Sequence, residues 1–313
     1  MNGLFSVLTG NLFSLFLLIA VGYAVMQLKW VPKDCPSSIS SLLLQVGLPA
    51  TVFTALIRPY DPNLLKDGAI VCALTAVFYL ISALLGLVLA KLCRVPLQRQ
   101  GAWMISMTFT NGGFMGFPII LALFGTEAFS LAAFTNITWT MFIYSLGVWQ
   151  LHYGQQEKGK GSAINWKRIL ITPINISLVI GLAFLLLSIT PPASIMQPMQ
   201  HLANLCTPLS MLLIGMTLAG KSLKEAIRDR DALSGALVRL IPVPLILLLI
   251  LKLIPFANSM ILPVLLMVFA MPSTALGSAL ADQNGADSEL AARITFLSSL
   301  FCIITIPLTL LLL

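Results

Sequence analysis

Two short runs of glycine, proline, hydroxyl and amide residues interrupt otherwise apolar segments of this sequence. The first is Thr110–Pro118 (TNGGFMGFP), and the second is Met271–Gly277 (MPSTALG). Glycine weakens a helix, and proline cannot donate to the preceding turn, so each run predicts a broken helix. In a membrane, the freed backbone groups must face protein, water or ligand. Because the N-terminus of a half-helix carries partial positive charge and open N–H groups, the chemistry that these runs favour is the binding of an anion such as a carboxylate.

Several residues of the two runs are candidates for contacts with such an anion. Asn111 offers an amide donor, and Ser273 and Thr274 offer hydroxyl groups. The backbone N–H groups of Gly112, Gly113 and the residues after Pro272 would complete the site. The structural alternative is that glycines allow close helix packing and prolines only kink helices. Because two matching runs occur, we favour the functional interpretation, and we expect helices to bend or break at Pro49, Gly116, Pro118, Pro208 and Gly277.

Two other polar residues, Asn136 and Arg239, lie inside apolar segments, and each has both a structural and a functional interpretation. Asn136 is costly in hydrocarbon unless it bonds across helices or lines a cavity, so structural and substrate-contacting roles stay open. For Pro49 and Pro208 we favour a packing role. Arg239 is ionisable and lies within about two turns of a helix end, so we expect its side chain to reach back to the membrane surface.

The composition requires lipid as the solvent for most of the chain. Of 313 residues, 58% are hydrophobic and 9% charged, and the mean hydropathy is +0.97. Apolar stretches of roughly 20 residues, each long enough to cross a bilayer, recur along the sequence. They predict an all-α membrane protein of about ten transmembrane helices, near residues 4–27, 37–56, 68–92, 102–124, 128–151, 169–189, 195–218, 232–253, 260–281 and 290–313.

The charges predict orientation rather than nucleic-acid binding. The net charge is +7, but the basic residues fall in short loops between apolar segments, 14 on one side and three on the other. The side with more lysine and arginine is expected in the cytoplasm, so both termini are predicted outside. Since the five cysteines (Cys35, Cys72, Cys93, Cys206 and Cys302) lack the spacing of a metal site, we expect free thiols, no metal and no cofactor.

The sequence also contains a weak internal repeat. Pro49 and Pro208 are 159 positions apart, and so are Leu131 and Leu290, each pair within similar surroundings. The repeat predicts halves at 1–151 and 169–313, joined by a cytoplasmic linker at 152–168. Because each half contains an odd number of helices, the second half is inverted relative to the first, a pattern typical of secondary transporters.

The motif at 111–118, the Met271-Pro272 pair and the closing stretch 286–307 resemble the auxin efflux carrier family. The resemblance covers nearly the whole chain, and that family includes bacterial malate and malonate permeases and the plant auxin exporters. It implies two inverted five-helix repeats whose fourth and ninth helices are broken and cross, as in the NhaA antiporter and the bile-acid transporters. It also implies an elevator movement in a bacterial cytoplasmic membrane.

The resemblance extends to the site, with differences. Asn136 matches a substrate-contacting asparagine of the plant carriers. Thr140 replaces a tyrosine, which argues against a large indole-like substrate. Thr110 replaces a proline, so Gly112 and Gly113 are expected to supply the first break. The charged pair on the third helix of the plant carriers has no counterpart here.

The function predicted from the sequence is secondary transport of small organic anions, including potential-driven export. A proton- or sodium-coupled importer of a dicarboxylate such as malate or malonate is the alternative, and a homodimer stays open. An intramembrane enzyme and a non-transporting receptor are remote alternatives. The two histidines lie near helix ends, and the sequence has no Gly-x-Ser-x-Gly motif and no phosphate-binding loop.

Overall fold

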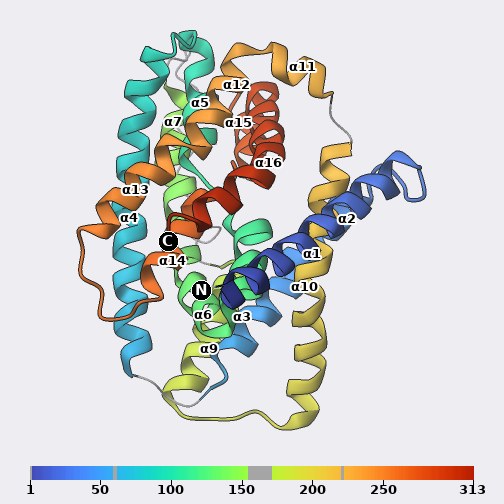
Figure 1. The fold of residues 1–313 in the computed structure, drawn as a ribbon, viewed down its shortest axis with the longest axis vertical. Helices are drawn as coiled ribbons and strands as arrows, with labels where there is room; N and C mark the ends of the chain where they lie inside the picture. Colours follow the sequence, from blue (N-terminus) through green and yellow to red (C-terminus); the bar gives the residue numbers. More distant parts are fainter. Residues whose placement is uncertain (1, 59–61, 154–170, 220–221) are drawn as a thin grey trace. The chain divides into compact units, whose positions relative to one another are not determined.

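The structure is a computed structural model that describes residues 2–58, 62–153, 171–219 and 222–313 (Figure 1). Every regular element within these ranges is an α- or π-helix, apart from one isolated bridge between Thr110 and Ser273. The expected all-helical class is therefore confirmed. The predicted linker lies outside the described residues except for its first two positions, and all five cysteines are free.

The elements of the first part of the chain follow the predicted apolar segments. The third predicted segment is one long helix, whereas short π-helical stretches interrupt the second and fifth. The elements are α1 (Asn2–Gln27), α2 (Cys35–Leu42), η1 (Leu43–Gly47), α3 (Leu48–Leu56), α4 (Pro62–Leu92), α5 (Leu97–Thr108), η2 (Gly112–Gly116), α6 (Phe117–Phe142), η3 (Ile143–Gly147) and α7 (Val148–His152).

Helices of the second part are more often divided. A single residue separates the end of α12 from Pro242, which begins α13, and a short helix precedes α12. The elements are α9 (Pro173–Leu186), α10 (Ala193–Ala219), α11 (Leu223–Arg228), α12 (Arg230–Leu240), α13 (Pro242–Lys252), α14 (Ile261–Ala270), α15 (Ala275–Gln283) and α16 (Ser288–Leu310).

Six helical stretches of the described chain are long and apolar enough to cross a membrane. Three further apolar helices are shorter, at Phe13–Gln27, Pro173–Leu186 and Ile261–Ala270. The arrangement of ten helices as two inverted repeats stays a prediction. The six candidate spans are Cys35–Leu56, Asn63–Leu92, Gly112–His152, Ala193–Ala219, Arg230–Lys252 and Ser288–Leu310.

Helical structure is interrupted within both glycine- and proline-rich runs. After α5 the chain is extended at Phe109 (φ −100°, ψ 132°), and after α14 it is extended at Met271 (φ −67°, ψ 152°). The expectation that Gly112 and Gly113 supply the first break was wrong, because the break precedes them and they already begin η2. A separate kink lies at Gly125, whose φ of +78° allows the chain to turn between the predicted fourth and fifth segments.

The chain forms two compact units, each built from separated stretches of sequence. The first contains 1–71, 113–137 and 170–220, and the second contains 72–112, 138–169 and 221–313. In the first unit α1 packs along α10, and α3 packs against α9 and α10 (Figure 1). In the second unit α5, α12 and α16 pack against one another, and α15 packs against α16.

Candidate functional site

The two extended segments meet as a short antiparallel ladder within the second unit. The N–H of Asn111 donates to the carbonyl of Pro272 at 2.8 Å, and the N–H of Thr274 donates to the carbonyl of Phe109 at 3.1 Å. Thr110 and Ser273 face each other between these two bonds. The ladder therefore satisfies backbone groups that the helix breaks set free. We call Phe109–Asn111 together with Met271–Thr274 the crossing.

Arg239 binds the carbonyl ends of both helices that lead into the crossing. Its Nη2 donates to the carbonyl of Phe269 at 2.6 Å, and its Nη1 donates to those of Met107 at 2.9 Å and Thr108 at 3.4 Å. Its Nε donates to the carbonyl of Met271 at 3.1 Å. The guanidinium therefore binds the last carbonyls of α5 and α14 together.

The hydrogen-bond pattern of an α-helix explains why these carbonyls are available. In a continuous helix the carbonyl of Met107 would accept from the N–H of Asn111, four residues later. At the crossing that N–H donates to Pro272 instead. The carbonyl of Phe269 likewise loses the N–H of Ser273, which donates to the hydroxyl of Ser298 at 3.1 Å. The donors of Arg239 replace these lost partners.

The expectation that Arg239 reaches the membrane surface was wrong. Its side chain is fully buried, and all the hydrogen bonds described above are to main-chain oxygens. The physical reason is the supply of freed carbonyls, because a guanidinium has five N–H donors and needs several acceptors when it is buried.

Two further side chains hold the crossing in place. Trp139 Nε1 donates to the carbonyl of Thr110 at 3.1 Å, and the hydroxyl of Thr295 donates to the carbonyl of Thr274 at 3.3 Å. Thr274 also caps α15, because its hydroxyl accepts from the N–H of Leu276 at 3.3 Å. The N-terminus of α15 therefore begins directly at the crossing.

The structure brings together six of the nine predicted substrate-binding residues. Thr110 and Ser273 are fully buried, whereas Asn111 is partly exposed. Thr140 lies in the same unit, buried and next to Trp139 in the chain, and Gly113 and Asn136 belong to the first unit. The six residues are Thr110, Asn111, Pro272, Ser273 and Thr274 of the crossing and Gly112, which directly follows Asn111.

Asn136 has a partner that the sequence reasoning did not identify. Its Nδ2 donates to Asn175 Oδ1 at 2.9 Å, and both side chains are buried in the first unit. Asn175 stands in the first turn of α9, where its N–H donates to the hydroxyl of the capping residue Thr172. The signal that could have revealed this pair was a lone amide within an apolar helix, in each of two segments.

The residues expected to bend or break helices occupy several different positions. Pro49 is the second residue of α3, directly after the π-helical η1, and Pro208 lies inside α10. Gly116 ends η2, Pro118 is the second residue of α6, and Gly277 is the third residue of α15. Their roles in movement stay predictions.

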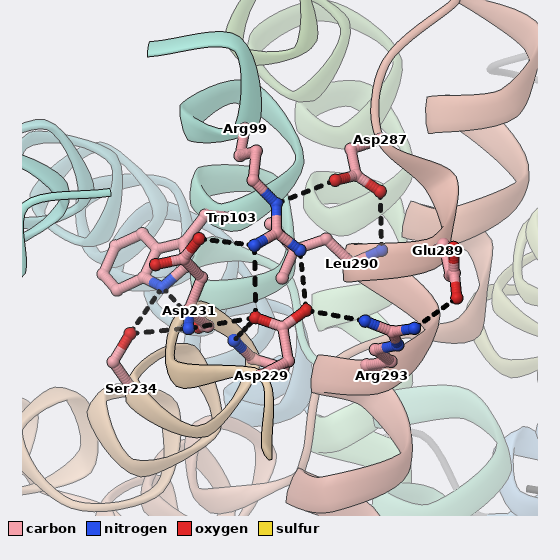
Figure 2. Close-up of polar contacts among 10 residues, drawn as sticks. Arg99, Trp103, Asp229, Asp231, Ser234, Asp287, Glu289, Leu290 and Arg293 are labelled. Carbon is pink, nitrogen blue, oxygen red and sulfur yellow. Dashed lines mark hydrogen bonds and ion pairs between the residues drawn. The ribbon is translucent and has the colours of Figure 1, made fainter. Parts of the chain in front are cut away.

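A cluster of charged residues lies near the start of α5, away from the crossing at its end (Figure 2). Arg99 binds three aspartates, Asp229 at 2.7 Å, Asp231 at 2.5 Å and Asp287 at 2.9 Å. Asp229 caps α12 and Asp287 caps α16, so one guanidinium joins the starts of three helices. In the described ranges no group of three or more His, Cys, Asp or Glu is placed to hold a metal ion.

A second arginine extends this cluster along α16. Arg293 donates to Asp229 at 2.9 Å and also pairs with Glu289 (Figure 2). Partial burial by itself would raise the pKa of Asp229, but the hydrogen bonds from Arg99 and Arg293 outweigh it and lower that pKa to about 2. The hydrogen bond to Asp229 raises the pKa of Arg99 above its ordinary value. Asp229 and Arg99 therefore stay ionised at neutral pH.

The long apolar helices are those of a polytopic integral membrane protein. The chain belongs to the membrane transport protein family, which matches residues 7–310 and is the auxin efflux carrier family that the sequence resembles. The function class predicted from the sequence, a membrane transporter, is thus confirmed.

Proteins similar to this chain carry transporter names. One named "Uncharacterized transporter", from Methanothermobacter thermautotrophicus, is 25% identical over 300 residues, which are 96% of each chain. A second uncharacterized transporter, from Methanocaldococcus jannaschii, is 22% identical and covers 93% of this chain and 94% of its own length. A "Putative malonate transporter" from Rhizobium meliloti is 26% identical over 225 residues, 70% of this chain and 69% of the relative.

Proposed function

We propose that this protein is a secondary carrier that moves small organic carboxylate anions across the membrane by alternating access. The observation that carries the proposal is the crossing, where two helix breaks 161 positions apart in the chain are joined by the Asn111–Pro272 hydrogen bond. The N-terminus of α15 begins there, and its partial positive charge suits a carboxylate. Paired breaks of this kind are typical of substrate sites in secondary transporters.

The residues of the crossing have separate roles in the proposed site. Asn111 is the amide donor to the carboxylate, since this residue is partly exposed. Ser273 and Thr274 contribute hydroxyl groups, and the backbone N–H of Gly112 is a further donor in the proposal. A Cβ placed at Gly112 would make ordinary van der Waals contact with Thr110 Oγ1 at 3.7 Å. The substrate contacts proposed for Gly113, Asn136 and Thr140 rest on the sequence alone.

The proposal includes the architecture predicted from the sequence. It has ten membrane-spanning helices in two inverted halves, 1–151 and 169–313, that work as an elevator in a bacterial cytoplasmic membrane. Both termini are then outside and the linker 152–168 is cytoplasmic. An inside-negative potential favours export of a monoanion by roughly 2.3 kcal/mol per 100 mV, so export needs no coupled ion.

A coupled importer of a dicarboxylate is the second candidate. The name of the relative from Rhizobium meliloti, a "Putative malonate transporter", supports the dicarboxylate substrate of this candidate. Import against an inside-negative potential requires a proton, a sodium ion or an exchanged anion. Counterflow of malonate in proteoliposomes, measured with and without proton and sodium gradients, separates the two: dependence on either gradient supports the importer, and flux driven by potential alone supports the exporter.

The function is tested by reconstituting the purified chain and measuring uptake of radiolabelled malonate, malate and an auxin-like aromatic acid. We expect saturable uptake of at least one short carboxylate. Asn111→Ala should lower the initial rate about tenfold or more, whereas Asn204→Ala, at an exposed position of α10, should leave it unchanged.

Two results would contradict the proposal at different levels. Unchanged flux in a folded Asn111→Ala protein overturns the site assignment. Absence of flux for every acid under every gradient, in wild-type protein of native melting behaviour, overturns the carrier function; binding without flux would then favour a receptor.

A further inference from the structure

Arg239 places a full positive charge inside the second unit. Its side chain is fully buried, and no carboxylate of the described residues lies within ion-pair distance of it. Burying a charge is costly, and buried arginines are normally paired with an acid. The carbonyls that bind Arg239 solvate the guanidinium but do not neutralise it.

The position of this charge has an electrostatic consequence for the crossing. The helices α5 and α14 both end there, and the C-terminal end of a helix carries partial negative charge. These two ends would repel an anion. Arg239 contacts the terminal carbonyls of both, so its positive charge offsets the two negative ends.

Aromatic side chains pack beside the ends of α5 and α14 and keep the surroundings of the crossing apolar. The ring of Tyr79 stacks on Phe109 with centroids 5.1 Å apart, and lies 5.0 Å from the ring of Phe269. All three side chains are fully buried. Since charge acts more strongly where water is excluded, the positive charge of Arg239 reaches the crossing with little screening.

We propose that Arg239 is a positioning residue that fixes the geometry of the crossing and, through its charge, sets the preference of the site for anions. This inference rests on the proposed carrier function. Because Arg239 offsets the negative ends of α5 and α14, the partial positive charge at the N-terminus of α15 is left to attract an anion. The fork of the guanidinium, which spans carbonyls of both breaks, keeps the two extended segments in register.

The geometric role and the electrostatic role of Arg239 can be distinguished by substitutions that keep or remove its charge. Arg239→Lys keeps the charge but loses the planar fork, and Arg239→Gln removes the charge. The experiment measures the Kd of malonate by calorimetry, and uptake in proteoliposomes, for full-length protein in lipid nanodiscs or vesicles. Arg230→Gln, at an exposed position of α12, is the matched control for the loss of one positive charge.

We expect Arg239→Lys to bind malonate within about threefold of wild type while its maximal uptake rate falls about tenfold. Arg239→Gln should weaken binding about tenfold or more, which corresponds to about 1.4 kcal/mol. A merely structural role would instead weaken both variants equally, because both lose the fork. Folded Arg239→Gln protein that binds malonate as tightly as wild type overturns the inference and leaves the carrier function standing.

A ligand series on wild-type protein keeps the test decisive if a variant does not fold. Malonate, malonamate and neutral malonamide have similar shapes and differ in charge. Binding that weakens about tenfold for each charge removed supports the inference. Equal binding of malonate and malonamide overturns it, whereas wild-type protein that binds and transports no carboxylate overturns the proposed function itself.

Discussion

The backbone N–H of Asn111 lies 2.8 Å from the carbonyl oxygen of Pro272, so the two interrupted helices are hydrogen-bonded to each other at their breaks. Each break leaves main-chain N–H and carbonyl groups without their helical hydrogen-bond partners. In this chain the replacement partners come from the backbone of the other break or from a buried side chain. The crossing therefore depends on a small number of side-chain hydrogen bonds within the second unit, and each of them can be removed by a single substitution.

Ser298 supplies one of these contacts, because its hydroxyl accepts from the N–H of Ser273 in the buried crossing. Ser298→Ala leaves that donor without its acceptor, and we expect a loss of about 1–3 kcal/mol in the free energy of unfolding. Chemical denaturation in detergent micelles measures it. Ser41→Ala, at an exposed site on α2, is the control and should be neutral; equal stability of both variants would contradict the role of Ser298.

Asn175 is predicted to stabilise the first unit through Asn136. Asn175→Ala removes the acceptor of a buried amide donor at 2.9 Å, which we expect to lower the free energy of unfolding by about 1–2 kcal/mol. The melting temperature of the purified protein provides the measurement. Asn204→Ala removes an amide from the exposed side of α10 and should melt as wild type does.

Two glycines set the close approach of α1 and α10 in the first unit. A Cβ at Gly215 would lie 1.9 Å from the carbonyl oxygen of Ile19, and one at Gly22 would lie 2.2 Å from that of Leu212. Backbone atoms cannot move aside cheaply, so Gly215→Ala should destabilise the protein by about 1–3 kcal/mol or more. Gly86→Ala is the control, because its Cβ would meet the flexible end of Met107 at 2.9 Å and Met104 at the ordinary contact distance of 3.5 Å. Denaturation midpoints that coincide for the two variants would refute this account.

Arg99 is predicted to hold the starts of α5, α12 and α16 together. Arg99→Gln leaves three aspartates close to one another without their shared cation, and the expected loss is about 1–3 kcal/mol, since the arginine is partly exposed. Arg230→Gln removes one positive charge from an exposed position of α12 and should have little effect. The melting temperatures of both variants are measured at low and at high salt. An unchanged melting temperature for Arg99→Gln would show that the cluster does not stabilise the fold.

Asp229 predicts a dependence of stability on acid pH. Its pKa is lowered to about 2 in the folded chain, against about 3.9 in an unfolded one. The unfolded state therefore binds the proton more readily, so the stabilisation is complete above about pH 4 and is lost as the pH falls toward 2. Asp229→Asn keeps a good helix cap but removes the charge, so its stability should fall less steeply in this window. A denaturation series between pH 5 and 2 in detergent compares the two slopes, and parallel slopes would contradict the assignment.

Much of the fold could be predicted from the sequence because its causes are local. The apolar segments fixed the helical class, since a backbone in lipid must satisfy its own hydrogen bonds. The two runs of glycine, proline and hydroxyl residues identified where helices are interrupted. The same reasoning placed the first break too late, at Gly112 and Gly113, because the ladder to Pro272 and Thr274 decides which residues are extended.

The partners of the polar side chains could not be predicted, since they come from positions far apart in the chain. Asn136 meets Asn175, and Arg99 meets aspartates more than a hundred residues away. Arg239 was expected at the membrane surface, because its own segment shows only its distance from a helix end. The sequence alone determined that this chain is a helical membrane protein in which two helices are interrupted. Only the tertiary structure decided that a buried guanidinium binds both, because the carbonyls that it needs exist only once the two breaks have come together.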